Sequence, residues 1–380
     1  MTVAFLTRDF SPGTNPPIPG GCAYYRCFLP MQAVGVPAQM GFPAWTGADG
    51  FGLMASQTTA NFGYTTVVLK QLMERSLPYQ MKAAKKLGQR IIVDVDDHYD
   101  ALPESNQAFH ITSPDFSKWQ NRDIYREVIM LADDVVVTTP ELFEHYSRLR
   151  GNVRIIRNAV LLDEFQQRKV SERKPVIGWV GGVPWRGGDL ETLQAWLPDF
   201  LDEHDLMFHH SGHSDSSPSF AELSGVNPER VSTSPLVTLD NYMKTMFTFD
   251  IGIVPLNDIP FNRAKSFLKG LEYAAAGIPF VAQALPEYRL LESQGVGRTA
   301  STPDEWRWHM EALLDYEKRK KEARINRALV ERFHTIQARS PEWQQLVTSQ
   351  LVTSDAGVEP MVSTFPEPPS SVKGAVLEVT

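Results

Sequence analysis

Short apolar runs recur along this chain and alternate with segments of helical periodicity. Five of the runs lie within residues 3–156, and four more lie within residues 176–282. The runs are VAFLT (3–7), TVVL (66–69), IIVDV (91–95), DVVVTT (134–139), VRII (153–156), VIGWV (176–180), LMFHH (206–210), DIGIVP (250–255) and PFVA (279–282). Buried strands that alternate with helices predict an α/β fold with parallel sheets covered on both faces, arranged as two Rossmann-like halves.

The segments between and after these two series differ in character. The stretch LLDEFQQRKVSERKP (161–175) is polar and charged, so we interpret it as the linker between the halves. Residues 304–335 have the pattern of a long helical region. From about residue 351 the chain is rich in Pro, Ser and Val without periodicity, which predicts a disordered tail or tether.

One helix start is marked by its capping residues. In TTPELFEHYSRL, Thr139 suits the N-cap and Pro140 suits the first helical position. Glu141 falls in the first turn, where the helix dipole favours an acid. The sequence therefore predicts a helix over residues 140–149.

Composition and charge narrow the function classes. The net charge of −8 argues against a general nucleic-acid binder, whose surface would be basic. No run of about 18 apolar residues occurs, so we expect no membrane span. The start MTVAFLTRDF lacks the features of a signal peptide. Only Cys22 and Cys27 occur, without metal or redox spacing, which indicates a reducing cytoplasm.

A glycine-rich loop follows the first strand of the second half. In VIGWVGGVPWRGGDLETL (176–193), Gly181 and Gly182 would let backbone N–H groups approach a phosphate, and Arg186 could bind its oxygens in pairs. The alternative is a plain strand–helix turn with an exposed arginine, because the loop matches neither the Walker nor the dinucleotide fingerprint.

A second polar stripe lies in AKSFLKGLEYAAAGIPFVA (264–282). Helical spacing places Lys265, Lys269 and Glu272 on one face, and Gly277 with Pro279 ends the helix. We expect a helix over 266–276 with Lys265 at its first turn, where the dipole favours anions. Glu272 could accept hydrogen bonds from two adjacent hydroxyls, as a ribose offers. The alternative is a Lys–Glu pair on a solvated helix face.

These motifs carry a family resemblance. LEYAAAGIPFVA resembles the donor-site helix of retaining glycosyltransferases with the two-domain GT-B fold, family 4 in particular. GGCAYYRCFLP (20–30), VDVDDHYDALP, ADDVVVTTPELFEHY and VRIIRNAVLLDEF resemble further segments of bacterial and phage members. The resemblance spans roughly residues 1–345, and it implies two Rossmann-like domains facing across a cleft, with a C-terminal helix returning to the N-terminal domain.

The resemblance also implies a domain layout. The N-terminal, acceptor-side domain would comprise residues 1–162, followed by a linker at 163–175. The nucleotide-sugar domain would comprise 176–335, the returning helix 336–350, and the tail 351–380.

The resemblance assigns roles to several residues. Glu272 matches the glutamate that contacts the donor ribose, whereas Ala264 stands where the family has another glutamate. Of the family's cation pair at the diphosphate, Arg186 is the best match, and glycine occupies the other arginine position. Either Lys265 replaces the missing cation or the donor is bound unusually. Gly20 with Gly21 would face the phosphates from the first half. The nucleotide-binding set is Gly20, Gly21, Gly181, Gly182, Arg186, Lys265, Ser266, Lys269 and Glu272. The residues expected to act in catalysis are Arg186, Lys265 and, as a polar contact to the sugar or acceptor, His110.

The implied activity is transfer of a sugar from a nucleotide-diphosphate sugar, UDP- or GDP-linked, to a glycan, protein or small molecule. The resemblance implies retention of configuration, no metal ion and no permanently bound cofactor. We expect a cytoplasmic protein, in the host cytoplasm if a phage encodes it. Two alternatives stay open. One is a degenerate GT-B protein that binds a sugar or nucleotide without turnover, as a particle-associated interaction protein, and the other is a sugar-nucleotide epimerase.

Two clusters could suggest a metal ion. Asp94, Asp96 and Asp97 could hold Mg²⁺ or Mn²⁺, but Asp97 fits an acceptor-side or structural carboxylate better. His209 and His210 are successive strand residues and point to opposite faces, so they do not easily share an ion. We therefore predict no metal site. The charged run EKRKKEAR (317–324) is interpreted as a solvated helix face.

Overall fold

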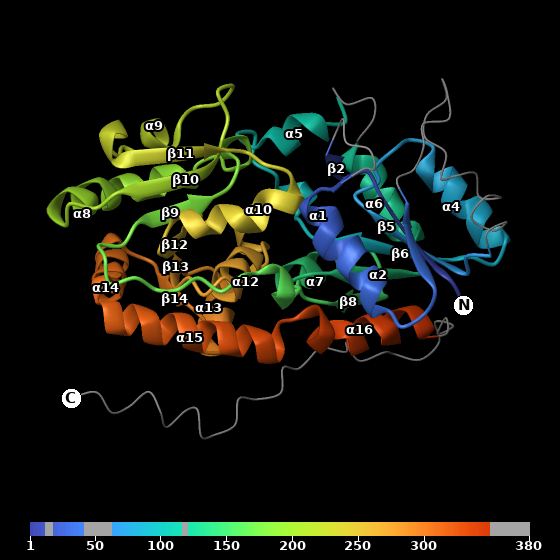
Figure 1. The fold of residues 1–380 in the computed structure, drawn as a ribbon. Coiled ribbons are helices and arrows are strands. Elements are labelled where there is room, and N and C mark those ends of the chain that lie inside the picture. Colours follow the sequence, from blue (N-terminus) through green and yellow to red (C-terminus); the bar gives the residue numbers. More distant parts are fainter. Residues whose placement is uncertain (12–17, 42–62, 116–120, 350–380) are drawn as a thin grey trace.

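The computed structural model describes residues 1–11, 18–41, 63–115 and 121–349, and the tail predicted from residue 351 lies outside this part. Two six-stranded parallel sheets, each covered by helices, stand side by side (Figure 1). We call the sheet of β1 and β4–β8 with its helices the N-terminal lobe, and the sheet of β9–β14 with its helices the C-terminal lobe. The α/β architecture predicted from the sequence is confirmed.

In the N-terminal lobe the strand order is β4-β1-β5-β6-β7-β8. Phe5 of β1 pairs with Met40 of β4 on one side and Val68 of β5 on the other. The central strands are buried along their whole length, as expected for strands covered on both faces. Their bounds are β1 Val3–Thr7, β4 Ala38–Gly41, β5 Thr66–Lys70, β6 Arg90–Val95, β7 Asp134–Val137 and β8 Val153–Ile155, with a small hairpin of β2 Phe10–Ser11 and β3 Ile18–Pro19.

In the C-terminal lobe the strand order is β11-β10-β9-β12-β13-β14. The bounds are β9 Ile177–Val180, β10 Phe208–His213, β11 Val231–Pro235, β12 Ile251–Val254, β13 Phe280–Gln283 and β14 Arg298–Ala300. All nine predicted strands are present, with bounds that differ from the expected ones by at most three residues. The sequence missed β4, β11 and β14, which lie at sheet edges; β11 reads VSTSP and lacks an apolar run because much of it is exposed.

Helices cover both sheets. In the N-terminal lobe they are α1 Gly21–Ala23, a π-helix Tyr24–Phe28, α2 Leu29–Ala33, α4 Leu77–Lys86, α5 Gln107–Ile111, α6 Arg122–Leu131 and α7 Pro140–Tyr146. The later helices are α8 Leu197–Glu203, α9 Phe220–Ser224, α10 Leu239–Thr245, α11 Pro260–Arg263, α12 Leu268–Ala275, α13 Pro286–Ser293, α14 Pro303–Leu314, α15 Tyr316–Phe333 and α16 Ile336–Thr348.

The long helical region predicted over 304–335 is divided. α14 ends at Leu314, and Asp315 caps α15 by accepting a hydrogen bond from the backbone N–H of Lys318. α16 then returns to the N-terminal lobe and lies along α2 (Figure 1). Arg90 of β6 fixes its end by donating to the carbonyls of Leu346 and Ser349, each at 2.8 Å. The predicted returning helix is therefore confirmed.

His334 lies buried at the junction between α15 and α16, with its ring against that of Phe267. Burial, with Arg339 and Arg157 nearby, lowers its pKa to about 3. An unfolded histidine titrates near 6.5, so between pH 6.5 and about 3 the unfolded chain binds a proton that the native state does not. This contribution to stability is complete above pH 6.5 and is lost as the pH falls.

We expect His334→Asn to reduce the dependence of stability on pH in this window. The loss of unfolding free energy on acidification should shrink by up to about 1.4 kcal/mol per pH unit, the value for one proton. Urea unfolding at pH 7, 6 and 5 measures this slope. Identical slopes for the two proteins would contradict the assignment.

The predicted N-cap of α7 is confirmed, although the helix ends at Tyr146 rather than at residue 149. The Thr139 hydroxyl accepts from the backbone N–H of Leu142 at 3.3 Å. It also donates to the carbonyl of Ala264 in the C-terminal lobe, at 2.9 Å. One hydroxyl therefore caps a helix and ties the lobes together.

Replacing Thr139 by alanine removes both contacts. We expect a loss of about 1–2 kcal/mol of unfolding free energy, from the cap and from one net hydrogen bond. Thr139→Ser, which keeps the hydroxyl, is the control and should lose less than half of this. Equal stability of the alanine variant and the parent in urea unfolding would refute the dual role.

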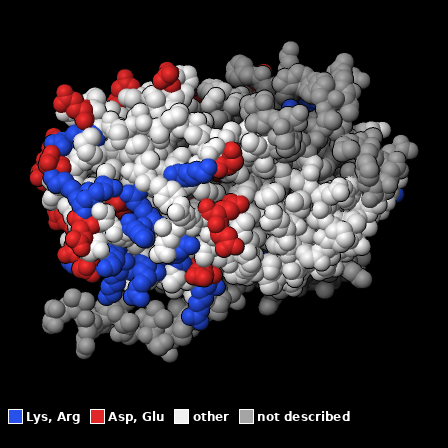
Figure 2. Space-filling view, in the orientation of Figure 1, with Lys and Arg blue, Asp and Glu red and all other residues white. Residues whose placement is uncertain are grey.

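Basic side chains gather over the linker and α15 in the view of Figure 2. The predicted solvated face holds for Lys318, Lys320 and Lys321, which are exposed. Arg319 is the exception, because it is buried and donates to the carbonyls of Leu313, Leu314 and Ser171. In the part of the chain that the structure describes, no helix is long and apolar enough to cross a membrane.

Candidate nucleotide-binding cleft

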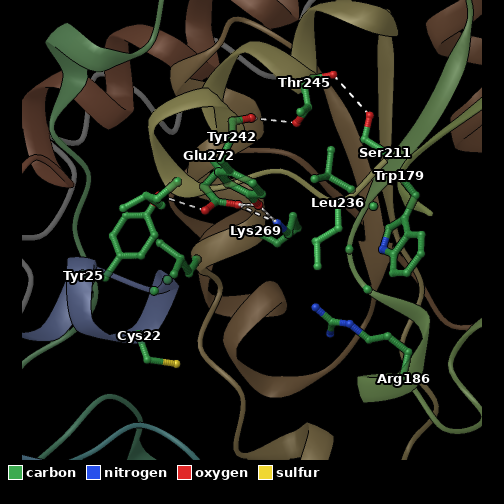
Figure 3. Close-up of a pocket in the computed structure, with 18 of the residues that line it drawn as sticks. Cys22, Tyr25, Trp179, Arg186, Ser211, Leu236, Tyr242, Thr245, Lys269 and Glu272 are labelled. Carbon is green, nitrogen blue, oxygen red and sulfur yellow. Dashed lines mark hydrogen bonds and ion pairs between the residues drawn. The ribbon is translucent and has the colours of Figure 1, made fainter. Parts of the chain in front are cut away.

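A cavity of about 460 Å³ lies between the two lobes and is lined by residues from both (Figure 3). All nine residues that the sequence predicted for nucleotide binding line this cavity: Gly20, Gly21, Gly181, Gly182, Arg186, Lys265, Ser266, Lys269 and Glu272. They come from three separate stretches of sequence. The fold therefore brings the predicted set together in one place.

The glycine-rich loop after β9 forms one wall. Gly181 lies so close to β10 that a side chain on Gly212, whose φ is +117°, would meet the Gly181 carbonyl oxygen at 2.5 Å. Gly187 approaches the N-terminal lobe, because a Cβ there would lie 2.1 Å from the Ser105 hydroxyl. Gly212 therefore combines a positive φ with close backbone packing, and Gly187 packs against Ser105.

Arg186 reaches into the cavity from this loop (Figure 3). Within the described residues its guanidinium makes no hydrogen bond, and its one acidic neighbour is Asp189, whose carboxylate is 3.9 Å away. That carboxylate is held by the backbone N–H of Asn257 and the side chain of Asn262. A guanidinium so weakly engaged can bind an anion without breaking a strong contact.

Lys265 also lines the cavity, but its predicted place in the first turn of a helix is wrong. α12 begins at Leu268, and Lys265 follows the short helix α11, which ends at Arg263. Its ammonium lies 4.2 Å from the centre of the Phe261 ring and 3.5 Å from the Asp97 carboxylate of the N-terminal lobe. Burial raises the pKa of Asp97, and Lys265 opposes this shift. Lys265 is therefore a bridge between the lobes, with its charge partly balanced.

Lys269 and Glu272 form a buried network instead of a solvated stripe. Lys269 donates to Glu272 Oε2 at 2.7 Å, and the Tyr242 hydroxyl of α10 donates to the same oxygen at 2.8 Å. Tyr25, from the π-helix of the N-terminal lobe, donates to Glu272 Oε1 at 2.8 Å. Burial raises the pKa of both tyrosines, so they remain donors at neutral pH. Lys269 is neutralised by Glu272 and is not a free cation.

On the N-terminal side, the glycine loop meets a carboxylate of the protein. A Cβ on Gly20 would lie 2.0 Å from Asp9 Oδ1, so a larger residue there would displace the Asp9 carboxylate. Asp9 Oδ2 accepts from the backbone N–H of Ala23 at 2.8 Å. The backbone N–H of Ala23, which could have faced a phosphate, is thus already bonded to the Asp9 carboxylate. The cationic side of the cavity is therefore the C-terminal lobe.

Buried charges support the N-terminal wall. Arg26 pairs with Asp94 at 2.6 Å, and Lys70 pairs with Asp96. Asp96 and Asp97 both line the cavity. Among the described residues, no group of three or more His, Cys, Asp or Glu side chains is placed to hold a metal ion.

His110 is not part of the cavity. It lies exposed on the short helix α5, with its ring beside that of Phe109, and it is absent from the cavity lining. The contact between lobes in this region is made by Asn106, which donates to the Trp185 carbonyl at 3.1 Å. The prediction that His110 contacts the sugar or acceptor is not supported by this position.

Several cavity residues were missed by the sequence analysis. Trp179 and Tyr242 line the C-terminal side, together with the segment 235–239. Trp179 lies in β9 and stacks on His210 with ring centres 4.9 Å apart. Only the position of Trp179 just before the glycine loop could have indicated it from the sequence.

Comparisons with known proteins show the fold. No protein-family model matches the chain, and no curated protein does. Sucrose-phosphate synthase from Thermosynechococcus elongatus aligns with a TM-score of 0.62 and 14% identity, over 91% of this chain and 98% of that one. HepE of Anabaena in complex with UDP and glucose aligns with a TM-score of 0.62 and 13% identity, over 92% of this chain and 100% of that one. A glycosyltransferase from Rickettsia africae gives 0.60 and 12%, over 92% and 99%. The chain therefore has the GT-B fold.

Proposed function

We propose that this protein is a glycosyltransferase that takes a sugar from a nucleoside-diphosphate sugar and transfers it to an acceptor in the cleft between its lobes. The observation that carries this proposal is the position of Arg186, a weakly engaged guanidinium in a cavity shared by two Rossmann-like lobes. The GT-B fold supports it, and so does the crystallisation of HepE with UDP and glucose and with UDP-glucose.

The C-terminal lobe would hold the donor. Arg186 and the backbone N–H groups near Gly181 and Gly182 would bind the diphosphate, with Lys265 at the side facing the other lobe. Glu272 would accept hydrogen bonds from the ribose. The division into an acceptor domain at 1–162 and a nucleotide-sugar domain at 176–335, joined by 163–175, remains part of this proposal.

The cationic groups would serve the chemistry by stabilising the negative charge that develops on the departing diphosphate. In that role they take the place of a metal ion, as the resemblance to retaining, metal-independent transferases implies. The acceptor would lie against the N-terminal wall near Asp96, Asp97 and Asn158, which line the cavity. Closure of the two lobes around both substrates would exclude water, which otherwise hydrolyses the activated sugar.

A second candidate is a GT-B protein that binds nucleotides without turnover. The favouring observation is Ala264, which stands where the resembling family has a glutamate for the donor sugar. Ala264 is buried against the N-terminal lobe, so no carboxylate reaches the cavity from this position.

Calorimetry with UDP, GDP and ADP, followed by incubation with the corresponding sugar nucleotides, tests the proposal. We expect one diphosphate to bind and its sugar nucleotide to be hydrolysed slowly without acceptor and consumed faster with one. Binding without any turnover across neutral sugars, glycans and proteins would favour the second candidate. Conversion of the sugar without release of the diphosphate would instead identify an epimerase. Absence of binding by all three diphosphates would refute the proposal.

A further inference from the structure

The carboxylate of Glu272 has little capacity left for a ligand. A carboxylate offers about four lone pairs, two on each oxygen. Oε2 already accepts from Lys269 and Tyr242, and Oε1 accepts from Tyr25. Glu272 is 3% exposed, so water does not compete for these positions. One lone pair remains on Oε1, whereas a ribose presents two adjacent hydroxyls.

We propose that Tyr25 gates nucleotide binding, because its hydroxyl occupies the oxygen of Glu272 that the second ribose hydroxyl needs. This inference rests on the proposed function, in which Glu272 binds the ribose. A nucleotide then binds fully only when the Tyr25 hydroxyl leaves Oε1. Tyr25 is thus a positioning residue that acts through Glu272 and not on the reacting atoms.

Of the three donors, Tyr25 is the one that can leave. Lys269 is charged, with 15% of its side chain exposed, and its departure would leave the Glu272 carboxylate as an unpaired charge in the protein interior. Tyr242 and Lys269 belong to the C-terminal lobe and also contact each other. Tyr25 is neutral and comes from the N-terminal lobe, so a small movement between the lobes, or rotation of one side chain, separates it from Glu272.

The local backbone supports a functional role. Tyr24 and Tyr25 open a π-helix, a rare conformation that is frequent at functional sites. Each of these two consecutive tyrosines donates its hydroxyl to a carboxylate that is distant in sequence. Tyr24 donates to Glu164, which follows the last strand of the lobe, and Tyr25 donates to Glu272. Tyr24 does not line the cavity, which makes it a matched control for Tyr25.

The test measures the affinity of UDP and of 2′,3′-dideoxy-UDP by calorimetry for the parent, Tyr25→Phe and Tyr24→Phe. Phenylalanine keeps the buried ring and removes only the hydroxyl, and melting temperatures verify that each variant is folded. We expect Tyr25→Phe to tighten UDP binding on the order of tenfold, since a hydrogen bond to a charged group no longer competes. The affinity for the dideoxy nucleotide should not change, and Tyr24→Phe should alter neither.

Unchanged or weaker UDP binding by Tyr25→Phe would overturn the gate while the proposed function stands. An equal gain for both nucleotides would also overturn it, because a general opening of the cleft does not depend on the ribose hydroxyls. If the parent bound no nucleoside diphosphate in the preceding calorimetry, the proposed function and the gate would both fall.

Discussion

Arg186→Ala is expected to weaken the binding of UDP by roughly ten- to hundredfold, equivalent to about 1.5–3 kcal/mol for hydrogen bonds to a charged group. The guanidinium faces the cavity, and among the residues that the structure describes its one acidic neighbour is Asp189, at 3.9 Å. Its interaction energy is therefore available to a ligand. For the same reason the variant should unfold at the same urea concentration as the parent. Calorimetry measures the affinity.

Arg263→Ala is the matched control for Arg186. Arg263 lies in the same lobe but is exposed, is paired with Asp258, and does not line the cavity. This variant should bind UDP like the parent. Arg186→Lys should give an intermediate affinity, because lysine keeps the charge but loses the paired donors of the guanidinium. Parental affinity in Arg186→Ala would remove Arg186 from the site.

The largest expected effect on stability is that of Arg26→Ala. Arg26 is 1% exposed and donates to Asp94 Oδ2 at 2.6 Å and to the Ile156 carbonyl at 2.8 Å. Its guanidinium also lies 5.0 Å from the centre of the Trp343 ring in the returning helix. Removing Arg26 leaves the buried Asp94 carboxylate with Lys70, which is 3.8 Å away and is shared with Asp96, so we expect a loss of about 3–5 kcal/mol.

Urea unfolding of Arg26→Ala and of Arg148→Ala compares a buried with an exposed ion pair. Arg148, just after α7, pairs with Glu144 of this helix, with 70% and 75% of the two side chains exposed. Such a pair contributes about 0.5 kcal/mol or less. A loss below about 1 kcal/mol in Arg26→Ala would contradict the structural role of the pair, since a buried charge cannot lose its partner so cheaply.

The sequence predicted the central strands well because burial on both faces leaves continuous apolar runs. It predicted nine residues of the cavity lining because glycines, cations and a glutamate follow the ends of strands. Ligands of open α/β sheets bind at these strand ends. Edge strands such as β11 were missed, since partial exposure permits polar residues. The start of α12 was misplaced by two residues, because Lys265 and Ser266 fit the helical periodicity although the chain turns there.

The partners of Glu272 could not be predicted. Lys269 is three residues away and was expected on the same face, but Tyr242 is 30 positions distant and Tyr25 is 247. Packing within the C-terminal lobe brings Tyr242 to Glu272, and the packing of one lobe against the other brings Tyr25 there. His110 is the opposite case. It was predicted to contact the ligand, but it is exposed on the short helix α5 and does not line the cavity.

The central claim is that the C-terminal lobe grips a diphosphate inside the cleft between the lobes. A crystal structure of the protein in complex with UDP tests it most directly. We expect phosphate oxygens within hydrogen-bond distance of the Arg186 guanidinium, with the ribose beside Glu272. Phosphates bound elsewhere, with Arg186 still free of any anion, would contradict it.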